Sequence, residues 1–256
     1  MNKKYDVAIV GAGVAGMTAA VYVRRAGKTV VLLEEKVPGG QIVNTSSVAN
    51  WPGEPGISGA DLARQIKEQI LELGAVLEYA TVFEVEKSDD GFVVKTEDGE
   101  FKVGAVILAM GTEPRKLSEE QMKSAGKRAI SYCATCDGAL YKDKPVVVVG
   151  SGNTAKHEIA YLSNIASKVY HVHHDEPIPE EAVAVFVAIG RVPHTEMAKG
   201  LVEIDKDGYI VAGEDCKTSC PGVLVAGDCR TKMTRQLVTA AADGAVAGNA
   251  AVQYLG

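Results

Sequence analysis

The chain has 256 residues, enough to bury a full core in one or two domains. Its hydrophobic share of 46% and charged share of 23% are ordinary for a globular protein, and its net charge of -6 argues against nucleic acid as the main partner. The apolar runs have the length of strands, so we expect no membrane span, and the N-terminus leaves no room for a secretory signal before the first strand. Five cysteines without a signal indicate a reducing compartment, and we expect the protein in the cytoplasm.

The first elements form a βαβ unit. We predict a buried strand at 5–10, a helix at 17–26 and a second strand at 28–34. The glycine turn at 11–16, of pattern GAGVAG, opens the helix, where a pyrophosphate can approach the backbone. Glu34 ends the second strand, where an acid can bind ribose hydroxyls. The pattern predicts a dinucleotide site without identifying the dinucleotide.

The middle of the chain alternates between helical and strand patterns. After a loop rich in Gly, Pro, Asn and Ser, the predicted elements are an amphipathic helix at 61–74, short strands over 76–104 with hairpin turns at 88–91 and 97–99, and a buried strand at 105–110.

A second strand-glycine-helix pattern starts at Pro145, with its helix predicted at 156–164, and is followed by two further strands, at 168–173 and 183–189. From about residue 209 the chain looks like the first domain resumed, with a strand at 223–226 and a helix at 236–254. We therefore predict an α/β fold with two Rossmann-like nucleotide-binding domains. The first is discontinuous, at 1–112 and 204–256, and the second, at 113–203, is inserted and truncated.

Cys133 and Cys136 form a Cys-x-x-Cys pair, which is either a redox dithiol or half of a zinc site. Zinc would need about two more ligands, and the sequence holds no second Cys-x-x-Cys, so we expect no metal. Asp137 favours redox chemistry because a dithiol needs a nearby proton donor or acceptor, although the same carboxylate can also cap the next segment. Asp228, at the end of a later strand, can accept hydrogen bonds from a polyol or act as a turn acid.

The segment Tyr132-Cys133-Ala134-Thr135-Cys136-Asp137-Gly138 resembles the active-site motif of the bacterial-type, low molecular weight thioredoxin reductases. The resemblance covers nearly the whole chain, with matches at 38–41, 50–53, 190–193 and 227–236. It implies an FAD-binding homodimer that reduces thioredoxin or a thioredoxin-like protein. It also implies that Cys136 faces the flavin, that Cys133 attacks the substrate disulfide, that Asp137 handles the proton, and that the inserted domain rotates to expose the cysteines.

The resemblance also implies where FAD binds. Glycines would hold the pyrophosphate, Glu34 the ribose and Asp228 the ribityl chain. The full set of implied contacts is Gly11, Gly13, Ala15, Gly16, Glu34, Gly40, Gln41, Asn50, Val82, Ala109, Gly111, Gly227, Asp228, Arg235, Gln236 and Leu237.

The second domain departs from the family pattern. His173 is followed by His174 and Asp175, where the family has arginines that bind the 2′-phosphate of NADPH. Only 45 residues run from Val146 to Gly190, too few for both βαβ halves of a dinucleotide fold. This shortening resembles the ferredoxin-dependent flavin thioredoxin reductases, so we expect ferredoxin as the electron donor.

Two alternatives remain open at this point. One is an NAD(P)H-dependent thioredoxin reductase with a minimal second domain, and the other is a flavin redox sensor without turnover. Ferredoxins are usually acidic, so a ferredoxin would need local basic patches on this acidic chain. The basic residues nearest the cysteines in sequence offer either such a docking patch or a solvated linker face; they are Arg115, Lys116, Lys123, Lys127, Arg128, Lys142 and Lys144.

Overall fold

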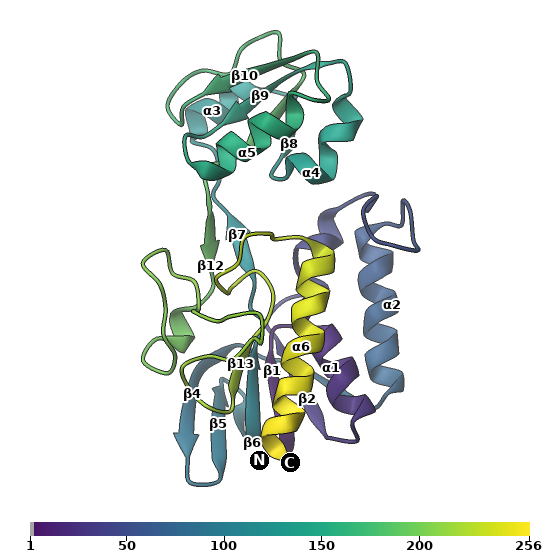
Figure 1. The fold of residues 1–256 in the computed structure, drawn as a ribbon, viewed down its shortest axis with the longest axis vertical. Helices are drawn as coiled ribbons and strands as arrows, with labels where there is room; N and C mark the ends of the chain where they lie inside the picture. The colour runs from purple at the N-terminus through teal and green to yellow at the C-terminus, as the bar shows by residue number, and fades with distance from the viewer. Residues whose placement is uncertain (1–2) are drawn as a thin grey trace. The chain divides into compact units, whose positions relative to one another are not determined.

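The computed structural model describes residues 3–256, which divide into two compact units (Figure 1). Unit 1 holds the chain up to Thr112 and again from Pro193 to Gly256, and unit 2 holds Glu113–Val192. The insertion therefore ends at Val192, whereas the sequence pattern put its end at residue 203. The physical reason is that Ala198 and Val202 are buried in the core of unit 1.

Unit 1 is built on a seven-stranded sheet in the order β3-β2-β1-β6-β5-β4, with β13 also paired to β6. The pairs among β3, β2, β1, β6 and β13 are parallel, while β4, β5 and β6 form antiparallel hairpins. The hairpin turns lie where the sequence predicted them. The strands are β1 (Lys3–Val10), β2 (Val30–Glu34), β3 (Val76–Tyr79), β4 (Val82–Ser88), β5 (Gly91–Thr96), β6 (Gly99–Leu108) and β13 (Val223–Val225).

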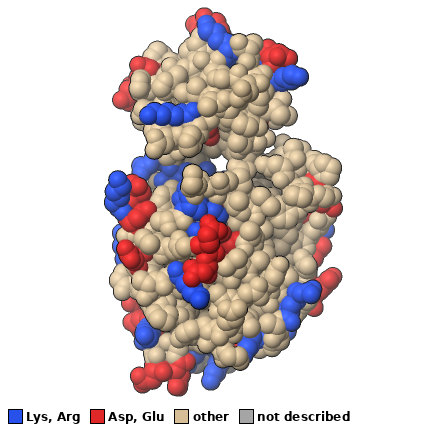
Figure 2. All heavy atoms as spheres, viewed as in Figure 1, with Lys and Arg blue, Asp and Glu red and all other residues tan. Residues whose placement is uncertain are grey.

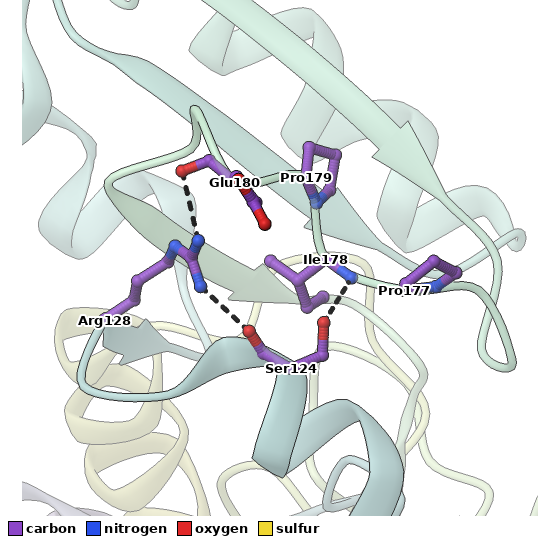
Figure 3. Close-up of a pocket in the computed structure, with 6 residues that line it drawn as sticks. All are labelled: Ser124, Arg128, Pro177, Ile178, Pro179 and Glu180. Atoms are coloured by element: carbon purple, nitrogen blue, oxygen red, sulfur yellow. Dashed lines mark hydrogen bonds between the residues drawn. The ribbon is translucent and has the colours of Figure 1, made fainter.

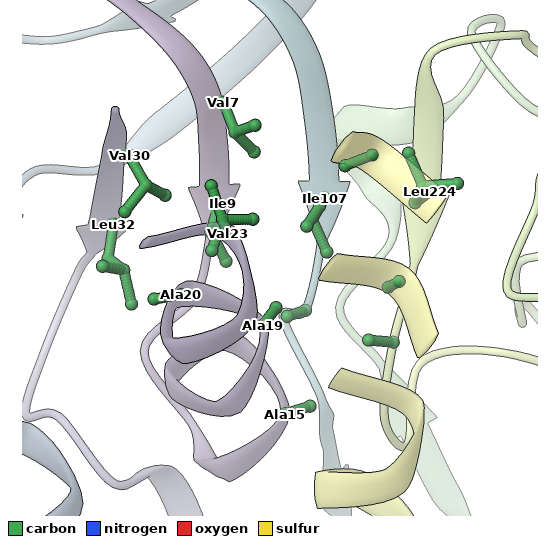
Figure 4. Packing of buried hydrophobic residues seen from close by; sticks show 14 of the residues in the cluster. Val7, Ile9, Ala15, Ala19, Ala20, Val23, Val30, Leu32, Ile107 and Leu224 are labelled. Carbon is green, nitrogen blue, oxygen red and sulfur yellow. The ribbon is translucent and has the colours of Figure 1, made fainter. Parts of the chain in front are cut away.

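Helices α1 (Val14–Arg25) and α6 (Leu237–Leu255) pack together and against this sheet (Figure 4). Small buried residues such as Ala15, Ala19 and Ala247 let the two helices approach closely. The remaining helical segments are α2 (Gly59–Glu72) and the short η1 (Gly40–Asn44) and η3 (Glu196–Ala198). This packing places the start of α1 at the carboxyl ends of the parallel strands, where Rossmann-type folds bind ligands.

Unit 2 contains a four-stranded parallel sheet in the order β10-β9-β11-β8. Its strands are β8 (Ala129–Ser131), β9 (Pro145–Val149), β10 (Lys168–Val172) and β11 (Ala184–Val187); its helical segments are α3 (Glu119–Ala125), α4 (Ala134–Asp137), η2 (Gly138–Tyr141) and α5 (Asn153–Leu162). Strands β7 (Thr112–Pro114) and β12 (Arg191–Pro193) pair with each other where the chain passes between the units. One βαβ half is present, β9-α5-β10.

Residues 173–183 form a loop without helix or strand, so the predicted loss of the second half is confirmed. Helix α3 and the residues after it hold this loop. Arg128 donates to the carbonyls of Glu180 and Ala182, and the Ser124 hydroxyl accepts the Ile178 amide at 2.9 Å (Figure 3). Gln121 donates to two further carbonyls of the loop. The shortcut is thus an ordered connection with its own hydrogen bonds.

The two helices that follow glycine turns begin three residues earlier than predicted, at Val14 and Asn153. The turn residues themselves form the first helical turn, and neither helix has a side-chain cap to mark its start. Helices α3 and α4 were not predicted at all. No helix in the described part of the chain is long and apolar enough to cross a membrane.

Candidate functional site

Cys133 and Cys136 form a disulfide at the start of α4, with their Cα atoms 5.3 Å apart. Strand β8 leads directly into the pair, and Cys133 is the N-cap residue of α4. Cys133 is half-buried and Cys136 is exposed. The Thr135 hydroxyl lies 3.3 Å from the Cys133 sulfur. The predicted dithiol is therefore assembled as a close, accessible pair.

Asp137 is held by a residue that the sequence analysis missed. The buried Ser131 hydroxyl donates to Asp137 Oδ2 at 2.6 Å and accepts the Cys133 amide at 3.1 Å. Ser131 thus ties the carboxylate to the backbone of the first cysteine. A serine two residues before a Cys-x-x-Cys was the available signal, since serines often bond to the backbone two residues on.

A second acid outside the motif, Glu158 on α5, approaches the cysteine pair. Its Oε1 atom accepts the amide of Ala134 at 3.4 Å. Burial raises the pKa of this carboxyl group, and the Ala134 amide and the charge of Arg191 only partly oppose that shift. Sequence spacing alone could not have found Glu158, because 22 residues separate it from Cys136.

In unit 1 the predicted glycine turn lies at the start of α1, and its first and last glycines lie close together. A Cβ atom at Gly16 would stand 2.0 Å from the Gly11 carbonyl oxygen, so only glycine fits there. Glu34 accepts the Ala12 amide at 2.7 Å and thereby binds the end of β2 to the turn. Gly13 is the N-cap of α1 without a side-chain cap, and a Cβ atom there would meet nothing within 4 Å.

The other predicted cofactor contacts also come together within unit 1. Asn50 donates to Gln236 at 3.1 Å, and Gln41 donates to the carbonyl of Thr112. Arg235 donates to the carbonyl of Asp228 at 3.2 Å and stacks on Tyr209.

Five predicted contacts belong to the ends of elements. Ala109 and Gly111 follow β6, Val82 begins β4, Leu237 begins α6, and Gly40 opens η1. Ala15 lies on α1 beside Gly227, where an added Cβ would stand 2.9 Å from that of Ala15. The predicted residues thus come from α1, β2, η1, β4 and α6 and from the loops that follow β1, η1, β6 and β13, all within unit 1.

A buried ion cluster fixes the loop that carries Asp228. Asp243 on α6 accepts from Arg230 at 2.8 and 3.0 Å, from Lys232 at 2.7 Å and from the Gly227 amide at 3.0 Å. Burial alone would raise the pKa of Asp243, but the bonds from the two cations outweigh it and the net shift is downward. The sequence analysis did not identify this cluster, which joins residues 13 positions apart.

These observations fit a flavin dinucleotide in unit 1. The uncapped α1 N-terminus supplies free amides for a pyrophosphate, and the open space at Gly13 leaves room for it. Glu34 supplies a carboxylate at the ribose position. Unit 2 has a corresponding strand, glycine turn and helix, but it lacks the second βαβ half.

In unit 2, residues 173–176 close a tight turn at the end of β10. Glu176 accepts the His173 amide at 2.7 Å, and His174 lies 3.1 Å from Asp175. Beside this turn a hollow is lined by Arg115, Lys116, His174 and Ile189. Two acids, Asp175 and Glu176, therefore follow β10. Two cations, Arg115 and Lys116, line the hollow from the segment that follows β7.

The basic residues near the cysteines do not act as one group. The guanidinium of Arg128 is bonded to four backbone carbonyls, so neither of the two alternatives, a docking patch or a solvated linker face, describes this residue. On the face shown in Figure 2, basic and acidic side chains are interspersed.

The other three cysteines are thiols. Burial raises the pKa of Cys216 and of Cys229 to about 11, so both stay protonated at neutral pH. Within residues 3–256 no group of three or more His, Cys, Asp and Glu side chains could hold a metal ion.

Comparison with known proteins places these features in a family. The pyridine nucleotide-disulphide oxidoreductase family profile matches residues 5–181 and 175–245. The chain is 36% identical to a thioredoxin reductase of Listeria innocua, covering 99% of this chain and 95% of that protein. It is 34% identical to the thioredoxin reductase of Bacillus subtilis, covering 99% and 96%.

Solved structures of thioredoxin reductases are also similar to this chain. The thioredoxin reductase of Streptococcus pyogenes is 32% identical, with a TM-score of 0.91 and coverage of 100% of this chain and 99% of that one. A ferredoxin-flavin thioredoxin reductase from Clostridium acetobutylicum is 26% identical, with a TM-score of 0.64 and coverage of 99% and 98%.

The comparisons also locate the shortening. The Listeria alignment spans 302 positions against 256 residues here, so at least 46 positions are gaps in this chain. The two matched segments of the family profile meet at residues 175–181, inside the loop held by α3.

Proposed function

The chain belongs to the pyridine nucleotide-disulphide oxidoreductase family as a homologue of thioredoxin reductases, and we propose that it is a thioredoxin-disulfide reductase. Its cofactor is FAD, the flavin of this family. The observation that carries the proposal is the Cys133–Cys136 disulfide beside Asp137, in a chain whose unit 1 is complete. The homodimer and the cytoplasmic location stay predictions.

Each predicted residue has a role in this proposal. The glycines of the turn and the start of α1 bind the pyrophosphate of FAD, and Glu34 binds its ribose. Asp228, held by Arg235, binds the ribityl chain. In unit 2, Cys133 attacks the disulfide of thioredoxin, Cys136 completes the exchange, and Asp137 holds or releases the proton. FAD, when bound, supplies the electron pair that reduces the Cys133–Cys136 disulfide.

A test that needs no natural electron donor isolates this proposal. The FAD-loaded protein is photoreduced without oxygen and mixed with oxidised thioredoxin, and the flavin absorbance is followed. Thioredoxin should reoxidise the flavin after each round of photoreduction in the full-length protein and fail to do so in Cys136→Ser. If thioredoxin leaves the reduced flavin unchanged, the proposal is wrong. A stable complex without repeated turnover would favour the redox sensor instead.

The electron donor has two candidates, and the comparisons support a nicotinamide at least as well as ferredoxin. The family is that of pyridine nucleotide enzymes, and three relatives at 34–36% identity are named as thioredoxin reductases without a special donor. The half β9-α5-β10 keeps the glycine turn at 150–152. Arg115 and Lys116 line the hollow beside His174.

A specific observation favours ferredoxin as the other candidate. Unit 2 contains one βαβ half, and its loop at 173–183 leaves no second half to support a nicotinamide. The acids at 175–176 would also repel a 2′-phosphate. A carrier of single electrons needs only to dock, so it is compatible with this shortening.

One anaerobic titration decides between the donors. NADPH, NADH and then reduced ferredoxin are added to the oxidised protein while the flavin absorbance is recorded. Rapid bleaching by either nucleotide identifies a nicotinamide donor, and bleaching by ferredoxin alone identifies the one-electron donor. His174→Glu, which adds an acid at the hollow, should slow only a nucleotide. Gln69→Glu, at an exposed position on α2 of unit 1, is the matched control for one added negative charge.

A further inference from the structure

Glu158 is a half-buried acid for which the proposed roles have no use. Helices α4 and α5 of unit 2 pack together (Figure 1), and the Glu158 side chain on α5 contacts the backbone of α4. One carboxyl oxygen takes the Ala134 amide, which lies directly after Cys133. The other, Oε2, is buried without a hydrogen-bond partner among the described residues. A buried carboxyl oxygen without a partner is costly, so a group kept there calls for an explanation.

The charged groups around Glu158 leave it as a separate acid. Burial raises its pKa, and Arg191 is the charged side chain within residues 3–256 that opposes this shift. Asp137, the acid of the motif, bonds to Ser131, and its charge acts on Tyr141. On α5 itself, Lys156 is exposed and His157 is exposed. The carboxyl group therefore contacts the cysteine segment through the Ala134 amide.

Resting on the proposed disulfide-reductase function, we propose that Glu158 is a positioning residue of the Cys133–Cys136 centre that couples dithiol reduction to proton uptake. It holds the backbone between the cysteines through the Ala134 amide. Its charge also sets the free energy of a thiolate formed beside it. Glu158 need not touch the substrate for either role.

The redox step shows how the coupling arises. Reduction breaks the Cys133–Cys136 bond and adds two electrons, which come from reduced FAD or from an added dithiol. When one proton arrives with them, the products are one thiol and one thiolate. The new negative charge makes an ionised Glu158 less favourable, so Glu158 takes up a proton from solvent. It releases that proton when the dithiol passes its electrons to another disulfide.

The test measures the midpoint potential of Cys133–Cys136 in the FAD-loaded full chain, with dithiothreitol buffers, from pH 5.5 to 9. Glu158→Gln keeps an acceptor for the Ala134 amide and removes the charge. At high pH the variant should be easier to reduce, by about three- to tenfold in the equilibrium constant. Tenfold corresponds to about 30 mV for a two-electron couple. The gap should close toward low pH, where Glu158 of the wild-type chain is protonated in both redox states.

Glu120→Gln is the matched control, because Glu120 is an exposed acid on α3 without a contact to the cysteines. It should leave the potential unchanged at every pH. Parallel profiles for Glu158→Gln and the wild type, or an equal shift in the control, would overturn the proposal. Because the reductant is a small dithiol, the measurement stands even if thioredoxin is not the substrate. Failure of the proposed function and failure of this inference are therefore distinguishable.

Discussion

The two units start from the same local pattern and end with different capacities. In unit 1, β1, a glycine turn, α1 and β2 are followed by further strands, and the sheet reaches seven strands. In unit 2, β9, a glycine turn, α5 and β10 are followed by a loop, and the sheet stops at four. A glycine turn therefore allows a phosphate to approach, but the segment after the second strand decides whether a dinucleotide is held.

The acids after the second strands show the difference at the level of single bonds. Glu34 reaches back to the glycine turn through the Ala12 amide and stays beside the α1 N-terminus. Glu176 instead accepts the His173 amide and closes its own loop. In our proposal Glu34 organises the FAD site, whereas Glu176 closes the loop at 173–183 that shortens unit 2.

The largest expected effect tests whether the cysteine pair of unit 2 reduces thioredoxin. Cys136→Ser should lower the rate of thioredoxin reduction by about 1,000-fold or more, because the exchange loses one of its two sulfurs. The flavin spectrum of unit 1 should not change. Cys220→Ser, at a half-buried cysteine of unit 1, should keep full activity in the same assay. Substantial activity in Cys136→Ser would mean that the cysteine pair of unit 2 does not reduce thioredoxin.

The next effect tests the rigidity of unit 1. Asp243→Ala leaves Arg230 and Lys232 buried without their carboxylate, and breaking such a buried network costs about 3–5 kcal/mol of unfolding free energy. Urea unfolding followed at Trp51 measures it, and FAD should dissociate more readily. Glu84→Ala breaks an exposed pair with Lys95 and should cost about 1 kcal/mol or less. Equal losses of unfolding free energy in both variants would mean that the Asp243 cluster stabilises unit 1 no more than a surface ion pair does.

The sequence predicted unit 1 better than unit 2 for physical reasons. Strand and helix patterns are local, so the βαβ unit, both hairpins and the split of the first domain could be predicted. The Cys133–Cys136 pair could be predicted because its motif is contiguous. Ser131, Glu158 and the Asp243 cluster act through contacts that the tertiary fold creates. The structural role of Arg128 could not be predicted, because a cation in a charged segment gives no sign that backbone carbonyls surround it.

A third prediction concerns the shortcut in unit 2. Arg128→Ala removes the donor that joins the end of α3 to the carbonyls of Glu180 and Ala182, and bonds from a charged donor contribute about 1.5–3 kcal/mol each. The local stability of unit 2 should fall by about 2–3 kcal/mol, seen as faster hydrogen exchange over residues 173–187. Lys127→Ala is the neighbouring control. If exchange in this loop is unchanged, the loop is not held as described.

A fourth prediction asks whether charge alone separates the two units as ligand sites. Replacing both His174 and Asp175 with arginine supplies two cations at the end of β10. We expect NADPH to bind up to about tenfold more tightly, since each charge-assisted bond contributes roughly 1–3 kcal/mol before desolvation. The rate of flavin bleaching at saturating NADPH should stay the same, because the missing half is not restored. NADH binding is the control for the 2′-phosphate. A rise in the saturating rate would show that charge was the whole difference.

The smallest effect is a difference in pH dependence between the units. The pKa of Asp243 is lowered by its bonds to Arg230 and Lys232, which outweigh burial, so its stabilisation is present above the unfolded value near 4 and lost as pH falls below it. The pKa of Glu158 is raised, chiefly by burial, so its ionised form destabilises unit 2 at neutral pH, and that penalty fades as pH falls toward the unfolded value.

Thermal unfolding from pH 4.5 to 8 measures this contrast. Glu158→Gln should be more stable than the wild type at pH 8 and equal to it near pH 4.5, whereas Asp243→Asn should be less stable throughout that range. The opposite signs arise because Arg230 and Lys232 both bond to the Asp243 carboxylate, while one oxygen of Glu158 has no partner in the described chain. If Glu158→Gln is no more stable than the wild type at pH 8, the inference that ionised Glu158 destabilises unit 2 is wrong.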